Sequence, residues 1–509
     1  MRWCLQHQRD SISEERNESG PYWKSEGLIV PFEDERQHND IRGKGPYFVH
    51  AYRRAKGGDD CIMLDTSTLT RETVRALQRK LYLKAKHQST FRFYSLYDKV
   101  YRSDVLQRAY DLVKQNKGSP GIDRETFETI ELGIGRIAYL QELQKTLKAK
   151  TYRAMPVKRV EIPKPNGETR PLGIPCIKDR IVQMAVKLII EPIFEADFSP
   201  HSYGFRPKRS AHQAMDDIKD GLLKGHIHVI DADLSKYFDT IPHYKLQKAV
   251  AERVVDSPVL SLLKQWLKVR IVKVEEGKET VIGGGNRARK GTPQGGVISP
   301  LLANVYLNIL DRIWDRNNLA EKHKAKLIRY ADDLVILCAR DTQTPYAILQ
   351  TVLNKLELKL NEDKTQIRDA RQERFGFLGF SVGIVKGEQT GKYFPLVEPS
   401  DKAMKAIKQK IQFYTRRDMN PVPIEGIVGK LNQTARGWSN YFHYGHGHRK
   451  MKKVKYYMEE CLRHHLRYRH KLNNRGAAYT RFPRSFIYDH LGLYKVPITP
   501  AWKGVHTKG

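Results

Sequence analysis

Two adjacent acids interrupt the apolar, β-branched stretch LIRYADDLVIL at positions 327–337. A run of this composition is typical of a buried strand. Asp332 and Asp333 lie in its middle, where burying one unpaired carboxylate is costly and burying two neighbours costs more. A fold that contains this stretch therefore has to neutralise the pair with a proton or a cation.

A second strand-like stretch, HVIDADLSKYFDTIPH, also carries acids. Asp231 and Asp233 are two residues apart and so project from the same face of a strand, with Asp239 following. If the two acidic strands pair in one sheet, three carboxylates gather at one point. Hard divalent ions bind few carboxylates and complete their shells with water and phosphate oxygens. The pattern therefore predicts a metal site for phosphoryl transfer, between the protein and a nucleotide.

A glycine-rich turn and an apolar helix are predicted from GTPQGGVISPLLANVYLNIL at positions 291–310. The glycines allow close backbone approach. Ser299 and Pro300 are expected to be the cap and first residue of the helix. Taken alone, such a turn is more often structural than functional.

The charge balance points to a polyanionic partner. The chain has 90 Lys and Arg against 57 Asp and Glu, a net charge of +33. Positions 401–509 hold 23 basic and 6 acidic residues, a net charge of +17, which is about half of the excess. Nucleic acid is the first candidate partner and a membrane surface the second.

The five cysteines are dispersed and none has CxxC spacing, which argues against a zinc ribbon or a Cys-ligated endonuclease site. They are Cys4, Cys61, Cys176, Cys338 and Cys461. Dispersed cysteines suit a reducing compartment. Since no apolar run approaches the roughly 18 residues that span a bilayer, we expect no membrane partner and a cytoplasmic location, in the bacterial cytosol or on the nucleoid.

Periodicity predicts a mixed α/β fold from about residue 63 to 390, followed by basic helices. A helix capped by Thr70 is expected near its start. The stretch VRIVKVEEGKETVIGGG alternates like a hairpin with a polar turn.

Three motifs in order, Asp-x4-Phe, PQG and YADD, resemble the palm of reverse transcriptases. The stretches at 97–123 and 160–214 are similar to the fingers blocks that precede it. IVGKLNQTARGWSNYFHYG at 427–445 resembles the maturase, or thumb, domain of group II intron-encoded proteins. The resemblance covers about 90–490. It implies an α/β (α+β) right-hand polymerase with fingers, an antiparallel palm sheet and a helical thumb.

The resemblance also implies a division of the chain. We expect a flexible N-terminal extension at 1–62, reverse transcriptase fingers and palm at 63–395, a helical thumb or maturase domain at 396–480, and a short basic tail at 481–509. The tail after Tyr494 has no cysteine and does not resemble the Cys/His endonuclease domain of some family members. Cleavage of a second target strand is therefore not expected.

The resemblance assigns the metal ligands to Asp233, Asp332 and Asp333, with the carbonyl of Leu234 helping to hold one ion. It places Asp332 and Asp333 in a hairpin turn, which relieves part of their burial cost. Two Mg²⁺ ions are implied, with Mn²⁺ as the alternative. Lys364 matches the residue thought to protonate the leaving pyrophosphate. Asp231 lies outside the matched motif and is expected to be structural.

Other roles are implied for nucleotide and RNA contacts. Lys164 and Arg170 match cations that grip the triphosphate, Phe238 matches the aromatic that excludes a 2′-hydroxyl, and Gln294 lies in the nucleotide pocket. Predicted RNA-binding residues are Arg206, Lys208, Arg209, Arg436, Lys450, Lys452, Lys453 and Lys455.

The implied function is an RNA-directed DNA polymerase encoded by a group II intron, which assists splicing and copies the intron during retrohoming. Its expected partners are intron RNA, an RNA template with a DNA primer, deoxynucleoside triphosphates and target DNA; a homodimer is left open. Two alternatives also stay open. One is a domesticated relative in DNA repair or phage defence, and the other is an RNA-binding splicing cofactor without polymerase activity.

Overall fold

The structure is a computed structural model of the chain. The predicted extension at 1–62 and the predicted triphosphate contact Lys164 lie outside the residues it describes. The described ranges are 66–163, 169–275, 278–388 and 391–500.

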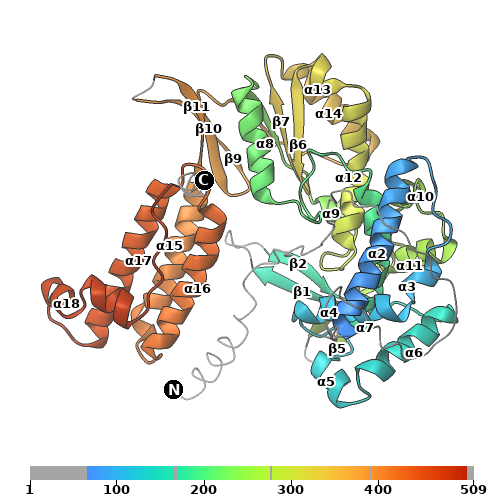
Figure 1. Cartoon of the computed structure of the whole chain (residues 1–509), viewed down its shortest axis with the longest axis horizontal. Coiled ribbons are helices and arrows are strands. Elements are labelled where there is room, and N and C mark those ends of the chain that lie inside the picture. The colour runs from blue at the N-terminus through green and yellow to red at the C-terminus, as the bar shows by residue number, and fades with distance from the viewer. Residues whose placement is uncertain (1–65, 164–168, 276–277, 389–390, 501–509) are drawn as a thin grey trace, which may run out of the picture.

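The described residues form helices and three sheets, which confirms the predicted mixed α/β class (Figure 1). Neighbouring strands are antiparallel except for the short parallel pairing of β1 with β4. The first sheet has the order β2 (Thr169–Ile174), β1 (Val157–Pro163), β4 (Ile271–Glu275), β5 (Lys278–Gly283). The second has the order β6 (Ala325–Tyr330), β7 (Asp333–Cys338), β3 (His228–Ala232), β8 (Gln366–Asp369). The third has the order β11 (Tyr393–Pro399), β10 (Phe380–Lys386), β9 (Phe375–Phe377).

Helices surround the first two sheets and then form a separate group at the C-terminal side (Figure 1). Those before the third sheet are α2 (Thr66–His87), α3 (Tyr97–Val100), α4 (Ser103–Gln115), α5 (Phe127–Leu132), α6 (Arg136–Lys148), α7 (Ile177–Glu195), α8 (Ala211–Leu223), α9 (Tyr237–Thr240), α10 (His243–Ala251), α11 (Ser257–Leu267), α12 (Ser299–Arg316), α13 (Leu319–Lys322) and α14 (Gln343–Lys355). Those after it are α15 (Asp401–Thr415), η2 (Arg417–Met419), α16 (Ile424–Phe442), α17 (His448–Arg469), α18 (Arg475–Arg481) and η3 (Phe486–His490).

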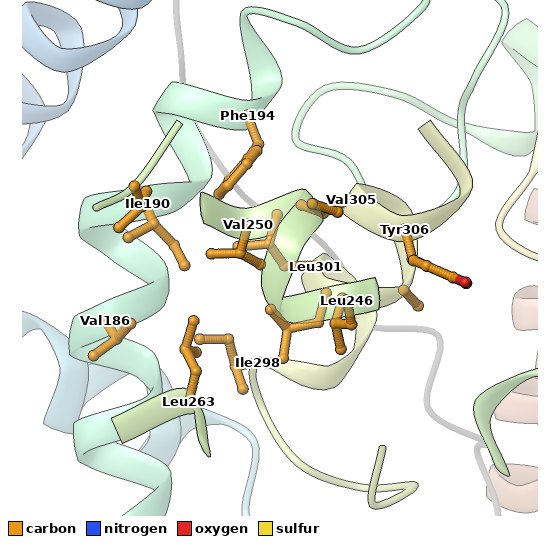
Figure 2. Packing of buried hydrophobic residues seen from close by; sticks show 14 of the residues in the cluster. Val186, Ile190, Phe194, Leu246, Val250, Leu263, Ile298, Leu301, Val305 and Tyr306 are labelled. Carbon is orange, nitrogen blue, oxygen red and sulfur yellow. The ribbon is translucent and has the colours of Figure 1, made fainter. Parts of the chain in front are cut away.

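The larger core lies between α7 and two helices, α10 and α12, that come between β3 and β6 in the chain. Figure 2 shows Val186, Ile190 and Phe194 of α7 facing Val250 of α10 and Leu301 of α12. All five are buried. This packing fixes the helices that precede and follow the glycine-rich turn, and so holds that turn in place.

A second core joins the C-terminal helices to the third sheet and to α8. Phe380 of β10 and Phe442 of α16 have ring centroids 5.1 Å apart. Ile487, Leu493 and Val496 are also buried in this core, so residues beyond α18 pack with the helical region. The division of the chain at 480 and 481 stays a prediction.

Two helix starts differ from expectation. The helix predicted to be capped by Thr70 begins earlier, at Thr66. Ser299 is the first residue of α12 rather than its cap, which is Ile298. The hydroxyl of Ser299 instead donates to the carbonyl of Pro293 at 2.9 Å, because the preceding glycines bend the chain back onto the helix start.

Candidate active site and nucleic-acid interface

The β6–β7 hairpin carries the two adjacent acids at its turn. Tyr330 pairs with Asp333, so Ala331 and Asp332 form the connecting turn and Asp333 begins β7. Ala331 has a φ of 57°, the left-handed conformation that such tight hairpin turns require. The prediction of a hairpin turn is confirmed for Asp332, while Asp333 is the first strand residue.

The other acidic strand, β3, pairs directly with β7. Asp231 lies opposite Val335, and Ala232 lies opposite Leu334. Because Asp233 follows Ala232, it lies at the end of the sheet where Asp333 begins β7. The expected pairing of the two acidic strands is confirmed, and it brings Asp233, Asp332 and Asp333 to one sheet end.

Crowding at this end changes the acidity of the carboxyl groups. Desolvation, followed by the charges of Asp332 and Asp233, raises the pKa of Asp333 to about 7. Desolvation is also the main cause that raises the pKa of Asp332, and the charge of Arg170 opposes it. Like charges held this close favour a bound cation, and a donor set of carboxylate oxygens suits a hard divalent ion. The residues present therefore fit such an ion.

Lys364 and Asn361 hold the carboxylate of Asp233 in this structure. Lys364 Nζ donates to Asp233 Oδ2 at 3.0 Å, and Asn361 Nδ2 donates to the same oxygen at 3.3 Å. In the part of the chain that the structure describes, no three His, Cys, Asp or Glu side chains are already arranged to hold a metal.

The backbone next to Asp233 is fixed by the chain segment that carries Lys364. Asp233 O accepts from Asn361 N at 2.8 Å, and Ser235 N donates to Lys359 O at 2.9 Å. These two hydrogen bonds are made by Asp233 and Ser235, the residues on either side of Leu234. Neither of them uses the carbonyl of Leu234, the predicted metal ligand. The role of the Leu234 carbonyl stays a prediction.

Phe238 lies on α9, five residues after Asp233 in the chain. Its half-buried ring meets the ring of Phe205 edge to face, with centroids 6.3 Å apart. Its carbonyl accepts from Thr292 N at 2.7 Å, which ties it to the glycine-rich turn. The ring predicted to face the sugar is thus packed against Phe205, and the backbone that carries it is tied to the glycine-rich turn.

The glycine-rich turn also contacts β2. The carbonyl of Gln294 accepts from Gly173 N at 2.6 Å, and its side chain donates to Asp239 Oδ2 at 3.4 Å. Gly295 has a φ of 106°, and a Cβ there would lie 2.2 Å from the carbonyl oxygen of Gly173. Glycine is therefore needed at this close approach. Arg170 is on β2, exposed, and near enough for its charge to act on Asp332.

Two regions of the chain match known protein families. Residues 162–382 match the family described as reverse transcriptase (RNA-dependent DNA polymerase), and residues 404–482 match the group II intron, maturase-specific domain. The chain is also 35% identical to Protein YkfC of Escherichia coli, over 60% of this chain and 87% of that protein.

The chain belongs to the group II intron-encoded reverse transcriptase and maturase family. It is 27% identical to Group II intron-encoded protein LtrA of Lactococcus lactis, over 73% of this chain and 74% of that protein. It is 26% identical to the Putative COX1/OXI3 intron 1 protein of Saccharomyces cerevisiae, over 82% of this chain. The chain spans about half of that yeast protein, since the match covers 53% of it.

Membership of this family makes the chain's enzyme class RNA-directed DNA polymerase. Reverse transcriptases use divalent metal ions, and this family binds intron RNA. No helix among the described residues is both long and apolar enough to cross a membrane.

One predicted RNA contact of this reverse transcriptase is corrected by the structure. Arg206 is only 3% exposed, and its guanidinium donates to Glu195 at 2.7 Å and to the carbonyls of Ser199 and Ser202 at 2.6 and 2.5 Å. A buried arginine whose guanidinium binds internal groups stabilises the fold and does not reach template phosphates. Its neighbour Lys208 is exposed, and the prediction for it stands untested.

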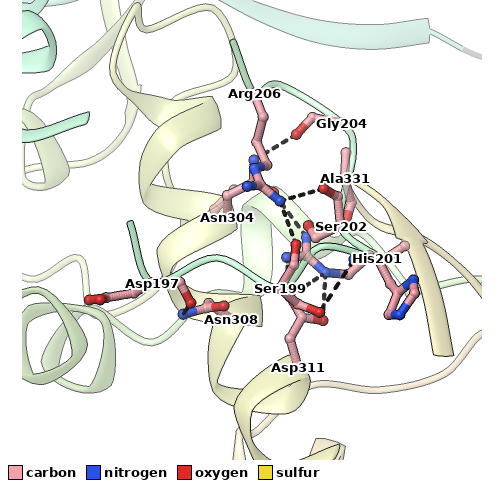
Figure 3. Close-up of polar contacts among 12 residues, drawn as sticks. Asp197, Ser199, His201, Ser202, Gly204, Arg206, Asn304, Asn308, Asp311 and Ala331 are labelled. Carbon is pink, nitrogen blue, oxygen red and sulfur yellow. Dashed lines mark hydrogen bonds and ion pairs between the residues drawn. The ribbon is translucent and has the colours of Figure 1, made fainter. Parts of the chain in front are cut away.

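The sequence did not predict a buried polar network that contacts the β6–β7 turn (Figure 3). Arg329 of β6 is 1% exposed and donates to Asp311 at 2.5 Å, to Asn304 Oδ1 at 2.9 Å and to the carbonyl of Ala331 at 2.9 Å. Asn304 Nδ2 in turn donates to the carbonyl of Gly204 at 2.7 Å. The network fixes the backbone next to Asp332. An arginine inside an apolar strand was the available signal, because it requires a buried acid as partner.

The predicted RNA contacts in the helical region differ in their availability. Lys452 and Lys453 are exposed on α17, and Arg436 is exposed on α16. Lys450 instead donates to Asp401 at 2.6 Å, and Lys455 lies half-buried. Pairing with a carboxylate offsets the charge of Lys450, so the two exposed lysines are the better candidates for phosphate contacts.

Proposed function

We propose that this chain copies RNA into DNA with Asp233, Asp332 and Asp333 as the ligands of two divalent ions, Mg²⁺ or in its place Mn²⁺. The observation that carries the proposal is the gathering of these three carboxylates at one end of the second sheet. Ions bound there would align a primer 3′-hydroxyl with the nucleotide α-phosphate and neutralise the charge that develops. The carbonyl of Leu234 would complete the set.

The surrounding residues would position a deoxynucleoside triphosphate. Arg170 and Lys164 would hold the phosphates, because a guanidinium binds phosphate oxygens in pairs. Phe238 would fill the space of a 2′-hydroxyl, and Gln294 would contact the nucleotide. Lys364, which pairs with Asp233 in this structure, would be released by metal binding and could then give a proton to the leaving pyrophosphate.

The helical region would hold RNA while the sheet end carries out chemistry. In this proposal residues 63–395 supply fingers and palm, and residues 396–480 supply the thumb that binds the intron RNA and assists splicing. Reverse splicing into target DNA would then place an RNA template beside a DNA primer, in the cytosol or on the nucleoid of a bacterium. The net charge of +17 in positions 401–509 supports this role.

The test is primer extension on an RNA template with two charge-matched variants. Asp233→Asn should lower synthesis roughly a hundredfold or more, as expected when one group that stabilises the transition state electrostatically is lost. Asp231→Asn removes the same charge two residues away and should keep most activity. Equal activity of Asp233→Asn and the unmodified chain would overturn the assignment.

A further inference from the structure

A cavity of about 530 Å³ opens in the helical region between α15, α17 and α18. That volume is within the range of small-molecule sites and can hold a base with its ribose. In Figure 1, α18 lies at the far side of the helical region from the second sheet, so the cavity is remote from the carboxylates. The lining residues used below are Gln412, Arg416, Tyr457, Glu460, Arg467 and Tyr479.

Positive charge dominates this cavity. Four arginines line it with a single acid, Glu460. Arg463 and Arg475 are paired with that acid, and Arg416 is paired at 2.7 Å with Asp418, which lies outside the lining. Arg467 has its contacts with His464 and Tyr468, neither of which is acidic. Burial is the main cause that lowers the pKa of His464, and the nearby charges of Arg467 and Arg475 add to it. An anionic ligand would offset this charge.

Flat side chains line the same cavity. Tyr457 is half-buried and Tyr479 is exposed, and the guanidinium of Arg463 lies 4.2 Å from the ring centroid of Tyr479. Tyr479 is held in place because its hydroxyl donates to Glu460 at 2.6 Å. Aromatic rings and guanidinium planes are the surfaces on which proteins stack unpaired RNA bases. The cavity thus combines phosphate-binding cations with a stacking surface.

We infer that this cavity binds one unpaired nucleotide of an RNA strand, with the base against Tyr457 and Tyr479 and the phosphate at Arg467. The inference deepens the proposed RNA-binding function and rests on it. A cavity with these groups would read a bulged or looped nucleotide, whereas the exposed lysines of α17 can contact any phosphate backbone. It would therefore give the helical region a preference for RNA shape.

The experiment uses the full chain and three RNA hairpins with the same stem. One carries a single unpaired 2-aminopurine, one carries an abasic residue at that position, and one has no bulge. Because stacking one base on an aromatic side chain gives a factor of about five or more, the first hairpin should bind at least about fivefold more tightly than the second. Its fluorescence should also be quenched on binding.

Two variants test the cavity without depending on the same side chain. Arg467→Gln removes a cation. Gln412→Trp places a larger side chain at an exposed position of α15 and narrows the cavity without removing charge. Gln412→Trp should abolish the preference for the unpaired base while leaving affinity for the abasic hairpin nearly unchanged. Arg467→Gln should weaken binding of the bulged and the abasic hairpins alike, because the abasic residue keeps its phosphate, and should leave binding of the hairpin without a bulge nearly unchanged. Arg340→Gln, an exposed arginine after β7, is the charge-matched control and should keep the preference. Thermal unfolding of each variant identifies any that is misfolded.

The outcomes separate the inference from the proposed function. Equal binding of the three hairpins by the unmodified chain would overturn the cavity's role and leave general RNA binding intact. Equal loss of all three hairpins in both variants would also overturn it. Failure to bind any hairpin at low salt would contradict the RNA-binding part of the proposed function, and the inference with it. Primer extension on a saturating primer-template should be unchanged in every variant.

Discussion

The reverse transcriptase part of the chain, up to β11, and the helical part, α15 to α18, use charge in opposite ways. In the first, several charged side chains are buried and held by directional hydrogen bonds beneath an open carboxylate site; Arg329, at 1% exposure, is the clearest example. In the second, many cations face solvent, among them Lys402, Lys405, Lys410, Lys452 and Lys453. One substitution should therefore suffice to disable the first part, whereas the second part should lose RNA affinity gradually as its cations are removed.

The largest effect on stability is expected from Arg329→Met. The substitution leaves Asp311 buried without its partner, which typically costs about 3–5 kcal/mol. Chemical denaturation measures the loss. The double variant Arg329→Met with Asp311→Leu should recover much of it, because an apolar pair replaces the ion pair. If the single variant is as stable as the unmodified chain, the Arg329–Asp311 ion pair does not stabilise the region under the β6–β7 turn.

A buried acid on α7 gives a pH dependence that surface acids should lack. Asp179 accepts hydrogen bonds from Tyr152 and Met155, but desolvation raises its pKa to about 6. The folded state therefore binds a proton more tightly than the unfolded state, and stability falls as pH rises from about 4 to 6, by on the order of 3 kcal/mol.

Asp179→Asn should remove that fall from the free energy of unfolding measured across this pH range. Asp401→Asn is the comparison in the helical part. Lys450 holds the pKa of Asp401 below its usual value, so its small contribution has the opposite sign and is lost as pH decreases. If the free energy of unfolding of Asp179→Asn falls with pH as it does in the unmodified chain, the burial of Asp179 is not the cause of that fall.

In the helical part, a graded loss is expected from lysine substitutions. Lys452→Gln with Lys453→Gln should lower the slope of log affinity for intron RNA against log salt by about 0.7–0.9 for each lost phosphate contact. Lys450→Gln should have less effect, since Lys450 is paired with Asp401. Binding titrations at several salt concentrations would decide, and a slope that does not change would remove these lysines from the RNA surface.

The smallest effect should come from Phe238→Ala. The half-buried ring packs against Phe205, so its removal opens space at the predicted sugar position. Ribonucleotides should then be incorporated more readily, with deoxynucleotide synthesis mostly retained. Single-nucleotide primer extension with each sugar measures the ratio. An unchanged ratio would mean that Phe238 does not exclude the 2′-hydroxyl.

The sequence allowed the acidic strands, the hairpin turn and the glycine-rich loop to be predicted, because each depends on neighbouring residues. It did not allow the partners of charged side chains to be predicted. Arg206 and Lys450 looked like RNA contacts, yet Arg206 is buried against Glu195, and Lys450 pairs with Asp401. Such pairs form only when the fold brings separate segments together, as it also does for Arg329 and Asp311.

The most direct test of whether DNA synthesis and RNA binding are carried by separate parts of the chain measures both activities in two variants. The variants are Asp332→Asn and the joint substitution of Lys452 and Lys453 by Gln; the activities are DNA synthesis on a saturating RNA template with its primer, and affinity for intron RNA. We expect Asp332→Asn to abolish synthesis and keep affinity, and the lysine variant to weaken affinity and keep synthesis. Loss of both activities in either folded variant would contradict the separation of chemistry from RNA binding.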